Sequence, residues 1–220
     1  MKVYLFESGL VWVIVGFATL IALNLMTLAI GPSGILQDLN LRPWGVLVSV
    51  FVFDSWGTAG GLAGVVVLFA PVLFAIPRAR RFNLSIFFLL ASIGSGIASN
   101  VIWSYFYNPG GDIGAGSSSI AISGQGIIFA MSILGTIKLG LTRDNEGTTR
   151  AGIAAREWRQ FYFIVYLTLI VSTLYFVIVL EPIYIPTLLY NWRVHEIAFG
   201  LAIAATAVFI GISSRRSPVY

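Results

Sequence analysis

The sequence predicts an all-helical membrane protein, and three observations support this fold class. Hydrophobic residues make up 58% of the 220 residues and charged residues only 10%, against about 25% in a typical soluble domain. The mean hydropathy is +0.91. Apolar runs long enough to cross a bilayer recur along the chain, since a bilayer core about 30 Å thick requires about 20 apolar residues in a helix. A water-soluble enzyme is therefore excluded, and the length fits a single domain, residues 1–220.

Six apolar runs, bounded by charged residues, proline or glycine, are the expected transmembrane helices. They cover residues 9–30, 58–76, 84–107, 120–137, 161–180 and 194–212. Backbone groups in lipid must satisfy their own hydrogen bonds, so each run is expected to be a helix. The first run is long for a signal peptide and lacks a small-residue cleavage site, so we expect it to be retained. The run 45–53 is too short to span, and we expect it to lie in the interface or dip into the protein.

Basic residues lie almost entirely on one side of the expected bundle. With six spans both termini share that side, and eleven of the 13 lysines and arginines fall on it: Lys2, Arg78, Arg80, Arg81, Lys138, Arg143, Arg150, Arg156, Arg159, Arg215 and Arg216. Arg42 and Arg193 fall on the other side. The positive-inside rule therefore places both termini in the cytoplasm. The outer segments are then residues 31–57, 108–119 and 181–193.

The residue types that are scarce in the sequence exclude several kinds of site. The chain has no cysteine, which excludes disulfides, thiolate metal ligands and cysteine nucleophiles. His195 is the single histidine, which excludes a multi-histidine metal centre and a haem held by two histidines. We therefore expect no metal and no cofactor, and we expect no nucleic-acid partner. His195 and Glu196 are the ionisable residues that stand out near the spans, which disfavours an ion-coupled transporter.

Ser123 and His195 are the candidate catalytic pair. Ser123 lies near the outer start of the fourth span and His195 near the outer start of the sixth, so we expect both at a similar depth. Serine needs a base to take its proton, and imidazole is the usual base near neutral pH. Gly124 removes a side chain beside the serine, and N–H groups at a helix start stabilise an oxyanion. Each of these residues has an alternative structural role. Ser123 could be a helix cap or a packing residue, His195 could be an interfacial residue, and Asn100 could form a hydrogen bond between helices.

The order and depth of these residues resemble the rhomboid family of intramembrane serine proteases. The resemblance covers about residues 8–213 and rests on the loop RPWGVLVSVFVFDSW, on the segment LASIGSGIASNVIWSYFYNPGG, and on AISG and HEIAFGLA, where the family has its GxSG and HxxGxxxG motifs. It implies a six-helix bundle with the fourth helix at its centre. It also implies that Ser123 is the nucleophile, that its N–H contributes to the oxyanion hole, and that His195 is the general base. The implied partners are transmembrane protein substrates within the lipid bilayer, and the apolar loop before His195 corresponds to the family's cover over the site.

The sequence departs from the family pattern at the second helix. The family's HxxxN motif, whose side chains help to hold the oxyanion, falls on Thr58 and Leu62. Thr58 or Asn100 is the expected replacement. Ala198 and Ala202 stand at the two glycines of the sixth helix, and they keep the small-xxx-small spacing for close packing of the fourth and sixth helices.

Three functions remain open on these residues. The first is an intramembrane serine endopeptidase that cleaves transmembrane substrates near the outer face through a Ser123–His195 dyad. The second is a catalytically inactive rhomboid-like protein that binds or escorts transmembrane clients, because the HxxxN pair is missing. The third is an unrelated six-helix membrane subunit or transporter. In each case we expect a multi-pass integral protein of a prokaryotic cell membrane.

Overall fold

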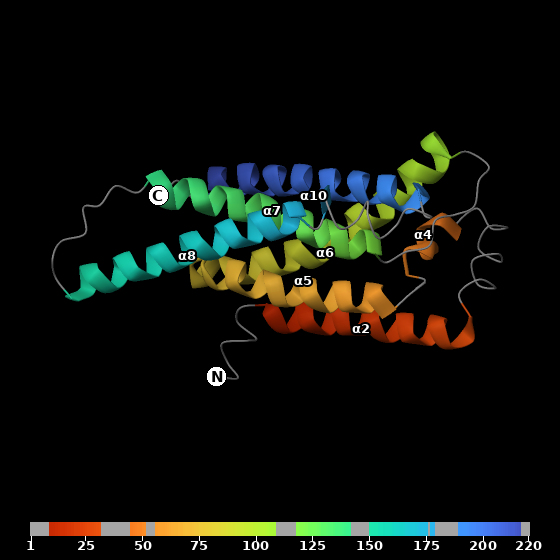
Figure 1. The fold of residues 1–220 in the computed structure, drawn as a ribbon, viewed down its shortest axis with the longest axis horizontal. Coiled ribbons are helices and arrows are strands. Elements are labelled where there is room, and N and C mark those ends of the chain that lie inside the picture. Colours follow the sequence, from red (N-terminus) through yellow and green to blue (C-terminus); the bar gives the residue numbers. More distant parts are fainter. Residues whose placement is uncertain are drawn as a thin grey trace.

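The computed structural model describes residues 9–31, 45–51, 56–108, 118–141, 150–175, 177–178 and 189–216. In this part the chain is helical and contains no β-strand, in agreement with the predicted class. Its long helices alternate in direction along one bundle (Figure 1): α2 (Leu10–Ile30), α5 (Trp56–Phe74), α6 (Arg78–Ile102), α7 (Ser118–Leu141), α8 (Arg150–Tyr175) and α10 (Leu189–Arg216). A short helix, α4 (Gly45–Ser49), packs against α6, and a π-helical turn, η1 (Trp103–Tyr107), extends α6.

Four helices in the described part are long and apolar enough to cross a membrane. Their apolar segments are Leu10–Thr27 in α2, Arg78–Tyr107 in α6 and η1, Ser118–Leu139 in α7, and Arg193–Ser213 in α10. The apolar segment of α5, Thr58–Phe74, is shorter. The fold is consistent with an integral membrane protein. The six spans and the cytoplasmic termini stay predictions, and residues 1–8 and 217–220 lie outside the described residues.

The observed helices follow the expected order, but α6, α8 and α10 begin well before the apolar runs. Helix α6 starts at Arg78, whereas the third run starts at residue 84. Helix α8 starts at Arg150, whereas the fifth run starts at residue 161. Helix α10 starts at Leu189, before the run at residue 194. Alanine, arginine and glutamate are good helix formers, so the polar segment before residue 161 continues the helix beyond its apolar part. Most of the three expected outer segments lies outside the described residues, and so do residues 183–188 of the loop before His195. Residues 189–192 of that loop belong to α10.

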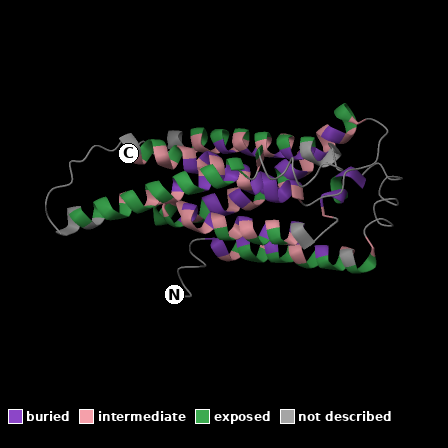
Figure 2. Cartoon of the chain, viewed as in Figure 1, coloured by how far each residue is buried: buried purple, intermediate pink, exposed green. Residues whose placement is uncertain are grey.

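Helix α7 is the centre of the bundle. It packs against α5, α6, α8 and α10, and its first half is almost entirely buried (Figure 2). Its glycines let neighbouring helices approach the backbone closely. A Cβ on Gly126 would lie 2.8 Å from the carbonyl oxygen of Phe199 and 3.1 Å from Cβ of Ala202, both in α10. The close packing expected between the fourth and sixth long helices is therefore present.

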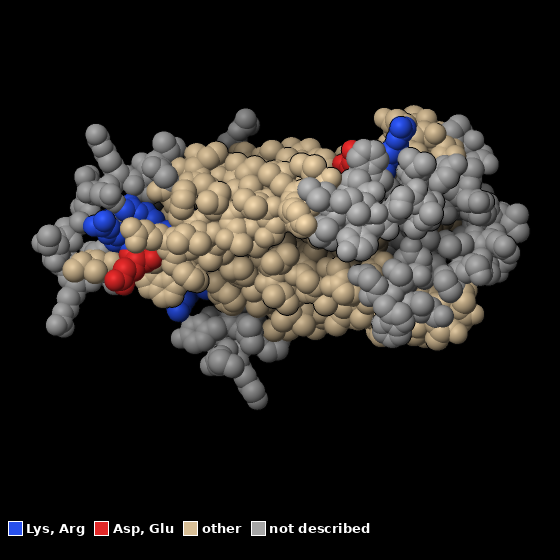
Figure 3. Space-filling view, in the orientation of Figure 1, with Lys and Arg blue, Asp and Glu red and all other residues tan. Residues whose placement is uncertain are grey.

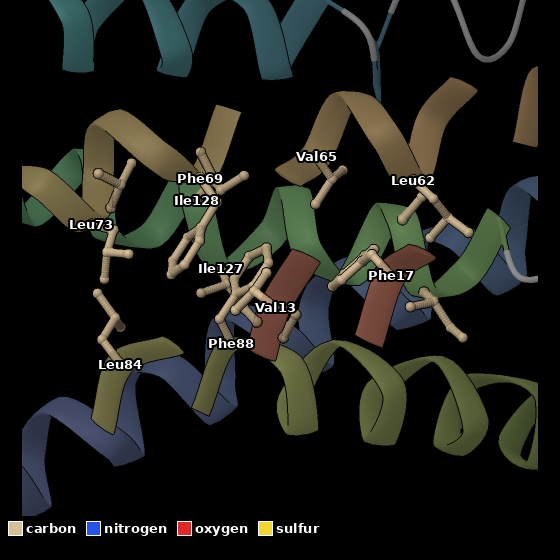
Figure 4. Packing of buried hydrophobic residues seen from close by; sticks show 14 of the residues in the cluster. Val13, Phe17, Leu62, Val65, Phe69, Leu73, Leu84, Phe88, Ile127 and Ile128 are labelled. Atoms are coloured by element: carbon tan, nitrogen blue, oxygen red, sulfur yellow. The ribbon is translucent and has the colours of Figure 1, made fainter. Parts of the chain in front are cut away.

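The apolar core lies where α2, α5 and α6 meet α7. Phe88 of α6 stacks on Phe69 of α5 with ring centroids 3.8 Å apart, and on Phe17 of α2 at 5.8 Å. Figure 4 shows these rings together with aliphatic side chains from α5 and α7. Lipid tails are as apolar as these side chains, so close packing rather than exclusion of water holds such helices together.

The two ends of the bundle differ in charge. Helices α6 and α8 begin, and α7 ends, at one end of the bundle, which we call the basic end. It holds these described side chains: Arg78, Arg80, Arg81, Lys138, Arg156 and Arg159. Figure 3 shows lysine and arginine side chains gathered at this end. The opposite end, at which α5, α7 and α10 begin, is called the distal end; Arg193 lies there. A broad uncharged band separates the two ends on the visible face. Exposed apolar side chains on several helices, such as Val67 and Leu90, fit contact with lipid.

Replacing Gly126 by alanine is expected to destabilise the fold by about 1–3 kcal/mol, the usual cost of overpacking. The added Cβ would meet the backbone of α10, which cannot rotate away as a side chain does. Gly200→Ala in α10 is the matched control, because a Cβ there meets nothing within 4 Å. Thermal unfolding in detergent measures both variants. Equal unfolding midpoints would show that α7 and α10 do not depend on this contact.

Candidate functional site

A serine–histidine contact joins the start of α7 to the second turn of α10 at the distal end. Ser118 is the first residue of α7, and His195 lies in the early part of α10. Nε2 of His195 lies 2.9 Å from Oγ of Ser118. The histidine is 5% exposed and the serine is partly exposed. The two helices run in the same direction, so their close packing brings their beginnings together (Figure 1).

The contact has the length and the partners of a nucleophile–base pair. Such pairs lie about 2.6–3.2 Å apart. When a neutral imidazole carries its proton on Nδ1, its Nε2 accepts a hydrogen bond from the serine hydroxyl. The N–H groups in the first turn of a helix have no acceptor within the helix, and they carry the positive end of its dipole. The start of α7 therefore combines a hydroxyl beside a base with donors suited to a developing negative charge.

Ser123 lies deeper in the interface between α7 and α10. Its Oγ donates to the carbonyl oxygen of Ser119 at 2.8 Å and lies 3.5 Å from the carbonyl oxygen of Ala198. Within the described residues, no hydrogen bond joins Ser123 to His195. Its backbone N–H lies inside α7, where the helical pattern directs it to the carbonyl of Ser119. Ser123 therefore ties the first turn of α7 to α10.

Gly124 is a packing residue in this structure. A Cβ at this position would lie 2.5 Å from Val65 of α5 and 3.4 Å from the ring of Phe88 in α6. The absence of a side chain thus lets α5 and α6 close on the middle of α7. These contacts give no support for the role beside an oxyanion that the sequence predicts for Gly124.

Thr58 lies at the depth of Ser118 on a neighbouring helix. Helices α5 and α7 run in the same direction, and a Cβ on Gly61 would lie 3.7 Å from Cβ of Ala121. Thr58 and Ser118 each lie three residues, or about one turn, before those contacting residues. Thr58 is buried, and its position on α5 is the one that corresponds to the first residue of HxxxN.

Asn100 reaches the same level from α6, which runs opposite to α7. A Cβ on Gly96 would lie 3.1 Å from the backbone nitrogen of Ile120, and Asn100 lies about one turn nearer the distal end. The Asn100 side chain is 3% exposed, and its Nδ2 donates to Oγ of Ser49 at 3.4 Å. Ser49 in turn donates to the carbonyl of Val46. Asn100 therefore links α4 to the bundle, the interhelical role left open for it by the sequence.

The sequence predicts that His195 pairs with Ser123, whereas in the structure His195 contacts Ser118. One signal for Ser118 is present in the sequence. Gly116 stands two residues before Ser118, at the spacing of the first glycine in GxSG, and Ala121 takes that place before Ser123. Gly124 matches the last glycine of GxSG, and this match makes Ser123 the serine that the motif predicts.

Comparison of the chain with protein-family models, with curated proteins and with solved structures finds no match. In the described part of the chain, no group of three or more His, Asp or Glu side chains could hold a metal ion. A proposed function therefore rests on the residues and contacts at the distal end.

Removing the Asn100–Ser49 hydrogen bond is expected to loosen α4. Asn100→Ala and Ser49→Ala break the same bond, so the double variant should lose less stability than the sum of the single losses, by about 0.5–1.5 kcal/mol. Thermal unfolding of the four proteins in detergent gives this coupling energy, and amide exchange across residues 45–49 reports the loosening. If the two stability losses are additive and amide exchange across residues 45–49 does not change, the hydrogen bond does not hold α4 in place.

Proposed function

We propose that the protein is an intramembrane serine endopeptidase of the rhomboid type, with Ser118 as nucleophile and His195 as general base. The observation that carries the proposal is the 2.9 Å contact between Ser118 Oγ and His195 Nε2. Two features of the fold support it: the contact joins two of the candidate membrane-spanning helices, α7 and α10, and α7 lies at the centre of the bundle, as the family resemblance implies. The proposed substrates are transmembrane proteins whose chain reaches the distal end of a six-span bundle with cytoplasmic termini.

The proposed reaction is acyl transfer followed by hydrolysis. Oγ of Ser118 attacks the carbonyl carbon of a peptide bond while Nε2 of His195 takes the hydroxyl proton. The carbon–nitrogen bond then breaks as the imidazolium gives this proton to the leaving amine, and an ester remains on Ser118. Water hydrolyses the ester with the same imidazole as base, which restores the serine. One histidine is sufficient for every proton transfer in this cycle.

The proposed oxyanion donors come from α7 and α5. The backbone donors are N–H groups at the start of α7. The side-chain donor is the hydroxyl of Thr58, at the depth of Ser118. Asn100 lies at the same level, and its amide donates to Ser49 of α4. We assign Thr58 the donor role of the missing HxxxN pair because it stands at the first position of that motif, and we assign Asn100 the role of supporting α4.

Ser118→Ala and His195→Ala are each expected to abolish cleavage of a transmembrane reporter substrate in proteoliposomes. Ser123→Ala is the matched control on the same helix. It removes a hydroxyl that bonds to backbone carbonyls, which is worth about 1 kcal/mol, so activity should stay within about tenfold of the parent. A fluorophosphonate probe should label Ser118, as located by peptide mass spectrometry.

The opposite pattern, with activity lost in Ser123→Ala and kept in Ser118→Ala, would reassign the nucleophile to Ser123. Cleavage that survives both substitutions would refute a serine mechanism. A parent protein that neither cleaves reporters nor takes up the probe, yet retains transmembrane clients on purification, would favour the inactive client-binding function.

Thr58→Val is expected to lower kcat by about 100-fold, the usual effect of losing one oxyanion donor, with little change in KM. Valine has nearly the shape of threonine without its hydroxyl, and Thr58→Ser keeps the hydroxyl and should keep most of the activity. Kinetics on the reporter substrate measure both variants. A Thr58→Val enzyme with the parent kcat would remove Thr58 from the oxyanion site.

A further inference from the structure

A groove lies between α7 and α8 at the basic end, opposite to the Ser118–His195 contact. It has a volume of about 320 Å³ and is lined by one residue of α7, Leu139, and by four residues of α8: Arg159, Gln160, Phe163 and Ile164. This volume falls in the range of about 300–1,000 Å³ that is usual for small-molecule sites. The groove thus has room for a ligand with a polar and an apolar part.

The lining changes from polar to apolar along α8. Arg159 and Gln160 stand before the apolar run that begins at residue 161, and Phe163 and Ile164 stand within it. The change takes four residues, or about 6 Å along the helix. Ile164 is 63% exposed and Phe163 is 37% exposed, so their side chains offer an apolar surface directly beside the cation. The order matches the boundary between headgroups and hydrocarbon in a membrane.

Positive charge flanks the polar part of the groove. Lys138 adjoins Leu139 in α7, and Arg156 lies one turn before Arg159 and Gln160, on the same side of α8. Glu157, the residue after Arg156, adds one carboxylate to this segment. All three of these flanking side chains are exposed. An anionic headgroup therefore meets complementary charge here, as expected for the end of a membrane protein that faces an anionic leaflet.

We propose that this groove binds a phospholipid with an anionic headgroup, such as phosphatidylglycerol. The phosphate contacts Arg159, and an acyl chain lies along Phe163 and Ile164 against Leu139. The proposal is independent of the function proposed for the distal end.

Binding in the groove should also hold α8 on α7. The ring of Tyr166 lies directly on Gly135, where a Cβ would overlap it. The groove begins about one turn beyond that contact, toward the basic end, because Leu139 follows Gly135 by four residues and Phe163 precedes Tyr166 by three. A lipid in the groove would continue the α7–α8 contact. Since a ligand that binds only the folded state raises stability, lipid binding should raise the unfolding temperature.

Thermal unfolding of the full chain in dodecyl maltoside tests the site. Added phosphatidylglycerol should raise the unfolding midpoint by several degrees, and phosphatidylcholine with the same acyl chains should raise it much less. Arg159→Gln should weaken phosphatidylglycerol binding about fivefold, as expected for one basic residue, measured by native mass spectrometry. Arg78→Gln is the matched control, because it removes the same charge at the same end outside the groove. Leu139→Trp should also weaken binding, by filling the apolar part while every charge is kept.

Several outcomes would overturn the site. Equal stabilisation by the two lipids would show that the groove does not recognise the headgroup. Equal losses of phosphatidylglycerol binding in Arg159→Gln and Arg78→Gln would show that the lipid responds to the overall surface charge of this end and not to the groove. Stabilisation by inorganic phosphate equal to that by the lipid would assign the groove to a free anion. If Arg159→Gln fails to fold, unchanged lipid binding by Leu139→Trp is sufficient to refute the proposal.

Discussion

The direct contact between the backbones of α7 and α10 is the constraint on which the candidate site depends. Gly126 lies against the carbonyl of Phe199, and Ser123 lies near the carbonyl of Ala198. Because the two helices run in the same direction, an approach at this depth also brings the start of α7 close to the second turn of α10 and sets His195 beside Ser118. A larger side chain below the pair would separate the helices by more than a hydrogen bond tolerates. Catalytic rates are sensitive to displacements of about 1 Å, so the small residues of the interface would matter to the proposed chemistry without touching a substrate.

Small residues also allow close packing on the other sides of α7. Gly61 meets Ala121, and Gly96 meets the backbone of Ile120. Helix α7 is thus held at close range by three neighbours and cannot move toward one without leaving another. The stacked rings of Phe69 and Phe88 lock α5 to α6 below these contacts. The depth of Thr58 and Asn100 relative to Ser118 follows from this packing rather than from any direct bond between them.

The sequence predicts the helices well and the site only in part, for physical reasons that differ. Apolar runs reveal the part of a helix that faces lipid or core, so the order of the helices is confirmed. The polar start of α8, from Arg150 to Gln160, leaves no hydropathy signal because it continues the helix outside the apolar layer. The partner of His195 is a finer question. Candidate serines stand at 117–119 and at 123, and helix periodicity fixes depth to about one turn, or 5.4 Å. A hydrogen bond requires agreement within a few tenths of an ångström, which only the packing of α7 on α10 supplies.

The two members of the pair differ in exposure, and this difference suits an acyl transfer. His195 is buried against the bundle, whereas Ser118 is partly exposed at the helix start. In the proposed reaction, a substrate carbonyl would approach the partly exposed serine while the buried imidazole removes the proton. An exposed imidazole would compete with the substrate for the same space, and a buried serine would need the bundle to open before each reaction. In the proposed reaction, the placement of the histidine deeper than the serine would separate proton transfer from substrate entry. This placement follows from α10 starting at Leu189, before the histidine, while α7 starts at the serine itself.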